Sequence, residues 1–307
     1  MTQSKPKRLI IWGLKQVYHT HRHIHQAFYK NAKKLGYETL WLEDDKKNQT
    51  YIQPGDVIIA SEVTGKMIPK KNTFEDYHLP VRNDVSYCLH NYSDVFKSKL
   101  EKHTYINLSV YSKLAETADT QLDTARYFDT KTRTLYQPWG TDLLVSEFKK
   151  PVYNKNRFVF WIGSIWNNAT NQGNILQIQK LKEVLRAYSI RFIQLRFIPD
   201  MLNIFFIRRS RIAPAIAGQY QVDINYLPCR VFKNISYGQL GITNVQKFTD
   251  ILGSDYIIQD KKPLEQVITN VLHMDKNTYM KEVKRQQKSI ATYTYKESIE
   301  YILRCLQ

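Results

Sequence analysis

Four of the eight histidines in this 307-residue chain lie within seven residues, at positions 19, 21, 23 and 25. Imidazole side chains can hold a metal ion or carry a proton near neutral pH. Apolar residues recur at helical spacing from Ile24 to Leu35, and Thr20 is a good N-cap, so His21 and His25 share one helical face. This pair has no acidic ligand beside it. We therefore expect no metal site.

A catalytic role suits the position of these histidines better. They follow a predicted strand, Arg8–Leu14, and so belong at the carboxyl edge of a parallel sheet, where ligands bind. The positive end of a helix disfavours imidazolium, and a neutral histidine there can accept a proton from a hydroxyl group. We predict His19 and His21 as the catalytic pair and His25 as a further cleft residue. The alternative is that all four are capping and solvated residues.

A second group of residues is suited to bind a diphosphate. In the segment 226–244 (YLPCRVFKNISYGQLGITN), Pro228 stands where a helix can begin. Arg230 and Lys233 are three residues apart, on one face near the helix N-terminus. Backbone N–H groups, the helix dipole and two cations together stabilise phosphate. The alternative is a pair of cations that faces solvent.

Other polar residues follow predicted strands and belong to the same edge of a sheet. The turn at Gly163 and Ser164 would let a phosphate or sugar approach the backbone closely, although an ordinary strand-to-loop turn would look the same. Arg211 and Asn234 are predicted to bind the same phosphate-bearing ligand. The remaining cleft candidates are Glu62, His90, Asp142, Gln219, Thr243 and Asn244.

Short apolar runs alternate with helix-like stretches along the chain, which is the pattern of βαβ units with a parallel sheet. A charged, irregular stretch, Glu147–Arg157, interrupts the pattern, which then restarts. We predict an α/β protein with two Rossmann-like, doubly wound domains that face each other across a cleft. The expected strands of the second half are 158–162, 191–195, 212–216, 242–245 and 256–258. The stretch 279–306 reads as one amphipathic helical region.

Three of these features resemble the GT-B-type glycosyltransferases: the strand that ends in Gly-Ser, the R-x-F helix with its following glycines, and the stretch LYQPWGTDL (135–143). As architecture the resemblance covers nearly the whole chain. It implies an acceptor-side domain at 1–148, a nucleotide-sugar-binding domain at 149–285 and a C-terminal helix, 286–307, that packs back on the first domain. It also implies that neither a metal nor another cofactor is needed.

The resemblance implies the transfer of a hexosyl or deoxyhexosyl group from a GDP- or UDP-linked sugar to a hydroxyl group of a glycan. Inverting enzymes of this type commonly use a basic residue, often histidine, after the first strand. Many members carry an acidic residue in the helix where this chain has Lys233. A basic residue there favours direct contact with the pyrophosphate, as in sites for GDP-sugars.

The net charge of +17 predicts anionic partners such as phosphorylated molecules, an anionic membrane surface or nucleic acid. We expect a nucleotide-sugar donor, a glycan or lipid-linked acceptor and peripheral contact with a membrane, but no specific nucleic acid, because no nucleic-acid-binding motif is present. No apolar run reaches the roughly 18 residues of a membrane span, and the first apolar run lacks signal-peptide features, so we expect a cytoplasmic protein. Two alternatives stay open: a basic nucleic-acid-binding protein, and an inactive GT-B-like protein that binds a nucleotide.

Overall fold

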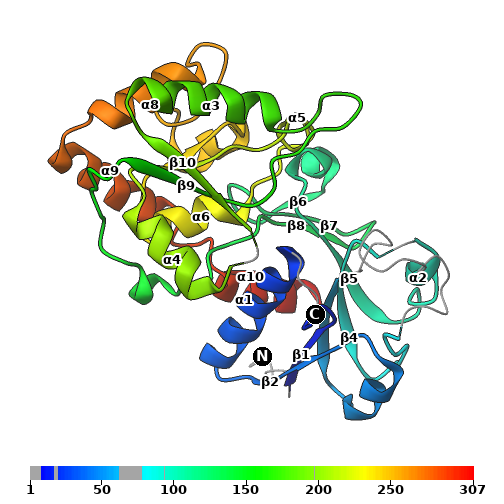
Figure 1. Cartoon of the computed structure of the whole chain (residues 1–307). Coiled ribbons are helices and arrows are strands. Elements are labelled where there is room, and N and C mark those ends of the chain that lie inside the picture. The colour runs from blue at the N-terminus through cyan, green and yellow to red at the C-terminus, as the bar shows by residue number, and fades with distance from the viewer. Residues whose placement is uncertain (1–7, 17–19, 62–77, 93, 197) are drawn as a thin grey trace.

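The N-terminal half of the chain is built on one mixed sheet. The computed structural model describes residues 8–16, 20–61, 78–92, 94–196 and 198–307 (Figure 1). The sheet has the order β2-β1-β3-β4-β5-β8-β7-β6, with parallel pairing from β2 to β8 and antiparallel pairing of β8, β7 and β6. Its strands are β1 (Arg8–Trp12), β2 (Glu38–Leu42), β3 (Val57–Ser61), β4 (Ser86–His90), β5 (Thr104–Ser109), β6 (Thr120–Gln121), β7 (Tyr127–Asp129) and β8 (Thr134–Tyr136).

Both faces of this sheet are covered, which explains why β1 is apolar at nearly every position. Leu9 and Ile11 face the core under α1 (Thr20–Lys34), whereas Ile10 and Trp12 face a core on the other side. This alternation follows from the two-residue period of a strand. The shorter helices of this half are α2 (Asp94–Ser98) and the 3-10 helices η1 (Lys46–Tyr51), η3 (Ser112–Thr117) and η4 (Val145–Glu147).

The C-terminal half repeats the βα alternation after an extended stretch, residues 148–157, that has neither helix nor strand. Its parallel strand pairs are β9 (Phe158–Ile162) with β10 (Arg191–Leu195) and β11 (Ala213–Ala215) with β12 (Gly241–Thr243). Arg211 N donates to Phe158 O at 2.8 Å and so joins the two pairs. The helices are α3 (Ile175–Ala187), α4 (Asp200–Arg209), α5 (Gln219–Asp223), α6 (Cys229–Ser236), η5 (Gln246–Phe248), α7 (Thr249–Leu252), α8 (Leu264–His273), α9 (Lys276–Ser289) and α10 (Tyr295–Cys305).

The strands predicted at 158–162 and 191–195 are confirmed at those bounds. The strand predicted at 256–258 is wrong as an element, because only Ile257 pairs with Thr243 of β12. Two backbone hydrogen bonds, from Ile258 N to Thr243 O and from Thr243 N to Tyr256 O, account for that single bridge. The domain boundaries at 148 and 285 stay predictions.

The helical region predicted at 279–306 is two helices, because the chain turns between α9 and α10. Thr294 caps α10, and its Oγ1 accepts from Glu297 N at 3.3 Å. The break lets the chain pass beside Gly140, where a Cβ atom would lie 2.7 Å from Tyr293 O. Only glycine fits so close an approach.

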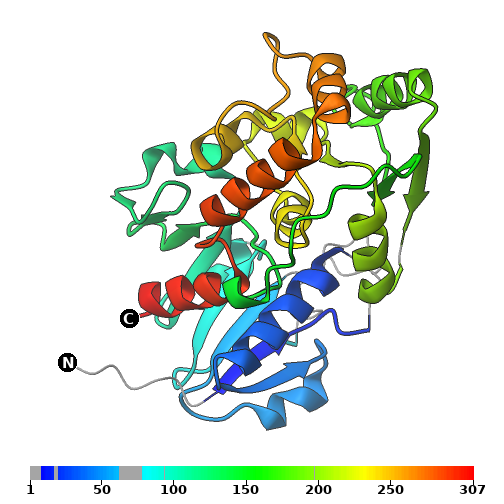
Figure 2. The same cartoon turned by 90° about the vertical axis from the view of Figure 1, so that its left-hand side faces the viewer.

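After the break, α10 returns to the N-terminal half and packs on α1 (Figure 2). Tyr295, Ile299 and Ile302 join the core that contains Phe28, and the rings of Phe28 and Tyr295 meet edge to face at 4.9 Å between centroids. None of the helices in the described ranges is both long and apolar enough to cross a bilayer.

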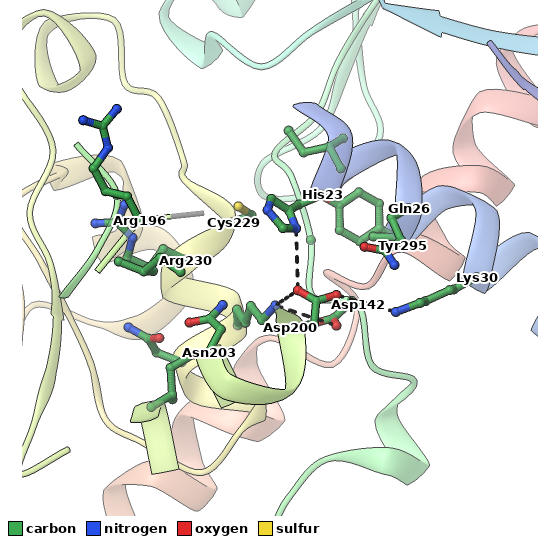
Figure 3. A pocket seen from close by; sticks show the side chains of 18 of the residues that line it. His23, Gln26, Lys30, Asp142, Arg196, Asp200, Asn203, Cys229, Arg230 and Tyr295 are labelled. Atoms are coloured by element: carbon green, nitrogen blue, oxygen red, sulfur yellow. Dashed lines mark ion pairs between the residues drawn. The ribbon is translucent and has the colours of Figure 1, made fainter. Parts of the chain in front are cut away.

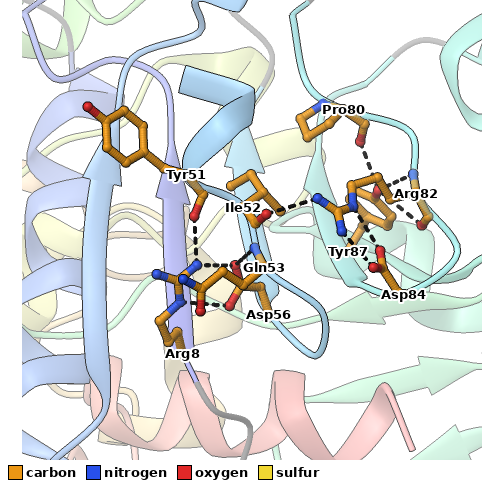
Figure 4. A network of polar contacts seen from close by, with 9 residues as sticks. All are labelled: Arg8, Tyr51, Ile52, Gln53, Asp56, Pro80, Arg82, Asp84 and Tyr87. Carbon is orange, nitrogen blue, oxygen red and sulfur yellow. Dashed lines mark hydrogen bonds and ion pairs between the residues drawn. The ribbon is translucent and has the colours of Figure 1, made fainter. Parts of the chain in front are cut away.

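A buried ion pair anchors the start of β1 (Figure 4). The guanidinium of Arg8 donates twice to Asp56, at 2.9 and 2.7 Å, and also to Tyr51 O at 2.7 Å. The Arg8 and Asp56 residues are only 6% and 1% exposed. The neighbouring pair of Arg82 and Asp84 has the same bidentate form but lies at the surface.

We expect Asp56→Ala to lower the free energy of unfolding by about 3–5 kcal/mol, because it leaves the Arg8 charge buried without its partner. The matched change Asp84→Ala should cost far less, since water can solvate Arg82. Urea unfolding of both variants measures the difference. Equal losses would show that burial does not distinguish the two pairs.

Candidate functional site

A pocket of about 180 Å³ lies where α1 of the N-terminal half faces α4 and α6 of the C-terminal half (Figure 3). Residues of both halves line it, including His23 and Lys30 from α1, Asp200 from α4 and Arg230 from α6. The carboxyl end of β9 opens into the same space through Gly163. The position agrees with the rule that ligands of parallel sheets bind beyond the carboxyl ends of the strands.

Arg230 has no protein acceptor in the part of the chain that the structure describes. It is the second residue of α6, and its guanidinium lies 4.3 Å from the centroid of the Trp161 ring. Burial lowers the pKa of Arg230, but a guanidinium keeps its charge in proteins. Its N–H groups are therefore available for an anionic ligand, and the N-terminus of α6 adds favourable backbone dipoles.

Gly163 makes room for this guanidinium. Its backbone has φ +118°, in the region that favours glycine, and a Cβ atom at this position would lie 2.5 Å from Nη2 of Arg230. A side chain would thus displace Arg230 from the pocket. The glycine noticed in the sequence is needed for space beside Arg230 as well as for backbone conformation.

Lys233, one turn further along α6, already has two carboxylate partners. Its Nζ lies 3.5 Å from Asp200 Oδ1 and 4.0 Å from Asp142 Oδ2. Burial opposes the charge on Lys233, but the two carboxylates outweigh burial and raise the pKa of Lys233. The Tyr237 hydroxyl also donates to Asp142 Oδ2, at 3.1 Å. The charge of Lys233 is therefore balanced within the protein, unlike that of Arg230.

Asp200 connects the two halves of the chain across the pocket. Its Oδ1 lies 3.6 Å from His23 Nδ1, and its Oδ2 lies 3.6 Å from Lys30 Nζ, so α4 is tied to α1 (Figure 3). The nearby ring of His23, together with the charges of Lys233 and Lys30, holds the pKa of Asp200 well below its usual range. The carboxylate is therefore ionised near neutral pH.

The sequence analysis missed both His23 and Asp200. His23, Ala27 and Lys30 are four and three residues apart, so they share the helical face that lines the pocket. This periodicity was a usable signal for His23. Asp200 follows a proline at the start of α4, and nothing in its local sequence distinguishes it from an ordinary first-turn acid.

Three other histidines, His21, His25 and His90, line a smaller, separate pocket at the ends of β3, β4 and β5. Ser61 Oγ lies 3.1 Å from His90 Nδ1 and 3.4 Å from His21 Nδ1. The rings of His21 and His90 are 5.1 Å apart, and Trp139 packs on His90 at 5.0 Å. His21 therefore faces a buried aromatic cluster rather than the larger pocket.

Two of these histidines are buried without a carboxylate partner. His25 is 2% exposed with Nδ1 3.0 Å from Gly13 O, and burial lowers the pKa of His25 to about 4. Burial likewise holds the pKa of His90 well below its usual range, and the charges of His21 and His25 lower it further. Across the described ranges, no three His, Cys, Asp or Glu side chains lie close enough together to hold a metal ion.

The structure places the predicted site residues in three groups. The residues that line the larger pocket are Asp142, Gly163, Ser164, Arg230, Lys233 and Asn234. Those around the smaller pocket are His21, His25 and His90. His19 and Glu62 lie outside the described residues.

The remaining four predicted residues line neither pocket. Arg211 donates to the carbonyl groups of Asn154 and Leu272 and thereby braces the C-terminal core. The Thr243 side chain is fully buried in β12, the Asn244 side chain bonds both backbone groups of Ala217, and Gln219 donates to Asp223 at 2.7 Å. These contacts are structural, and they explain why polar residues occur there.

The buried histidines should make the protein less stable in mild acid. Because the pKa of His25 is about 4 when folded and near 6.5 when unfolded, the unfolded state binds this proton first as the pH falls. The stabilisation is complete above about pH 6.5 and is lost towards pH 4, with a contribution of about 3 kcal/mol. Urea unfolding of the wild type and His25→Gln across this range should show their stabilities converging. The exposed His273→Gln serves as the control and should parallel the wild type.

No protein-family model matches the chain, and no curated protein matches it. Solved structures do match over nearly its full length. An alpha-glucosyltransferase in complex with UDP and a 13-mer DNA with a central A:G mismatch has 11% identity and a TM-score of 0.62, covering 96% of this chain and 99% of that chain. The complex with a 13-mer DNA containing a HMU base gives 10% identity and 0.61 over the same shares.

A trehalose-6-phosphate synthase, OtsA, matches with 10% identity and a TM-score of 0.57, covering 97% of this chain and 98% of that chain. Identities this low are informative about the fold alone. The chain thus has structural matches to GT-B glycosyltransferases over nearly its full length, and its α/β architecture is GT-B-like.

Proposed function

We propose that this protein transfers a sugar from a nucleotide diphosphate donor to a hydroxyl acceptor. The observation that carries the proposal is Arg230, a charged guanidinium without a protein acceptor among the described residues, in a pocket between the two halves. A half-buried charge without a protein partner is unfavourable, so such a group indicates an anionic ligand. The GT-B-like fold makes a nucleotide diphosphate sugar the best-supported anion.

In the proposed reaction, negative charge develops on the departing diphosphate. Arg230 and the N–H groups at the start of α6 would stabilise that charge in the transition state, where it counts most for the rate. Lys233 would hold Asp142 and Asp200 in place. It could contact the phosphate only if one of these two ion pairs breaks. Gly163, Ser164 and Asn234 stay predicted donor contacts. The choice between UDP and GDP also stays a prediction.

A thermal-shift and calorimetric screen against UDP, GDP, CDP and dTDP, each with and without its sugar, tests the donor class. Arg230→Gln should weaken binding of the best ligand by about 1.5–3 kcal/mol, the scale of a charge-assisted contact. The exposed Arg186→Gln, on α3, controls for the general loss of positive charge. If no nucleotide binds the wild type, or if Arg230→Gln binds as well as Arg186→Gln, the donor site is assigned wrongly.

We further propose that His23 takes the proton of the acceptor hydroxyl. Its Nδ1 faces Asp200 in the pocket, which leaves Nε2 as the acceptor of the proton. As the hydroxyl oxygen bonds to the anomeric carbon, the bond to the diphosphate breaks and the product is inverted. Asp200 would orient the ring. The catalytic pair of His19 and His21 stays a prediction; His21 lines the smaller pocket.

His23→Gln should reduce turnover about a hundredfold or more while nucleotide binding stays unchanged, because the base acts on the acceptor. His21→Gln is the matched control on the same helix and should keep most activity. Product configuration, followed by NMR, should show inversion. Full activity of His23→Gln together with retained configuration would rule out a base at this position.

A second candidate function is the transfer of a sugar to a hydroxyl group of nucleic acid. The net charge of +17 favours it, and two of the similar structures contain DNA with UDP. Steeply salt-dependent binding of DNA or RNA would support this acceptor. Nucleic-acid binding without any thermal shift by a nucleotide sugar would instead favour a binding protein, and nucleotide binding without transfer would favour an inactive GT-B-like protein.

A further inference from the structure

Helix α4 exposes an apolar stripe to solvent. Met201, Leu202 and Phe205 are 82%, 48% and 45% exposed, and their spacing places them on one face of the helix. The opposite face is also apolar, because Ile207 is buried and Phe206 stacks on Phe160 at 5.1 Å between centroids. A surface helix normally presents polar side chains to water. Three large apolar side chains together therefore indicate an interaction surface.

Cations surround the end of this stripe. Arg209 lies over the Phe205 ring at 4.4 Å, and the segment before β9 is held against the same end of α4. Asn154 donates to Arg208 O at 2.6 Å, and Asn156 donates to Arg209 O at 2.7 Å. The exposed cations on these segments are Arg209, the chain neighbours Lys155 and Arg157, and Lys150, whose backbone O accepts from Arg208 Nη1 at 3.4 Å. No carboxylate of the described residues forms an ion pair with these four.

We propose that this surface, the stripe of Met201, Leu202 and Phe205 with its basic rim, docks on an anionic lipid bilayer. Apolar side chains at the level of the headgroups, flanked by lysine and arginine, are what such a surface requires. A ten-residue helix is about 15 Å long, far short of the roughly 30 Å hydrocarbon core, so α4 would lie on the membrane.

Charge argues against the other occupants of this surface. A second copy of the chain, related by a two-fold axis, would bring two basic rims together and repel itself. Nucleic acid would match the cations but would leave the aliphatic Met201 and Leu202 without a fitting partner. An anionic bilayer satisfies both the charge and the apolar stripe.

The location of the surface links docking to the site. Asp200 and Asn203, on the inner side of α4, line the pocket between the halves, while the stripe faces outward. Docking through α4 would therefore bring the pocket close to the bilayer surface, where a lipid-linked acceptor would be found. The docking step itself does not depend on the proposed sugar transfer.

Co-sedimentation of the full chain with phosphatidylcholine vesicles, with and without phosphatidylglycerol, tests the proposal at low and high salt. We expect the wild type to bind the anionic vesicles at low salt. It should bind neither the anionic vesicles at high salt nor the neutral vesicles. The triple variant Met201→Gln, Leu202→Gln and Phe205→Gln should bind the anionic vesicles at least about tenfold more weakly than the wild type. Leu176→Gln and Leu114→Gln change residues of 57% and 56% exposure on other elements, and should bind like the wild type.

The proposal is overturned if the wild type ignores anionic vesicles at low salt, or if the triple variant sediments with them like the wild type. Light scattering separates a second copy from a lipid surface, because a dimer that the triple variant abolishes would assign the stripe to self-association. Arg209→Gln with Lys150→Gln should reduce binding and its salt dependence while leaving the melting temperature unchanged. Nucleotide binding, measured in parallel, reports separately on the proposed donor site.

Discussion

The arrangement of the two halves depends on one contact. The segment at Thr141, which leads out of the N-terminal half, lies beside the segment 293–295, which returns to it. Thr141 N donates to Tyr293 O, and Tyr295 N donates to Thr141 O, so the outgoing and returning segments are bonded like a short pair of strands. Thr141 Oγ1 also lies 2.6 Å from Ser236 Oγ at the end of α6. Because Gly140 has no side chain, the two segments can touch. This contact sets where α10 returns to the first half, and it fixes Asp142 beside the pocket.

The pocket next to this contact is lined by cations of two kinds: those paired with a carboxylate, and Arg230, which has no acceptor among the described residues. Lys233 and Lys30 share Asp200, so their charges are largely compensated, and together with His23 they hold α1, α4 and α6 together. Arg230, which lines the same pocket, has no acceptor in the described part of the chain. An anionic ligand gains most where the protein has not already balanced the charge. The division explains how one pocket can be both well ordered and ready for a phosphate.

Much of the fold could be predicted from the sequence, because Phe158–Ile162 is a short apolar run typical of a buried strand and apolar residues recur at helical spacing in Leu264–His273. Local patterns were less reliable where a partner decides the outcome. The strand expected near Ile257 is reduced to one bridge. The helical region after residue 279 is broken where the backbone groups of Tyr293 and Tyr295 bond to Thr141.

The sequence by itself determined the α/β class and the return of βα units after a linker, and it pointed to Gly163 and Arg230, which now line one pocket. Those features depend on residue type and spacing within one segment. Only the tertiary structure decided which histidine enters the pocket, since His21 and His23 differ by 200° around one helix and face different neighbours. It also decided that Asp200 is the partner of His23 and Lys233, and that Arg211 bonds carbonyl groups of the C-terminal half. Contacts between segments far apart in the chain leave no trace in either segment alone.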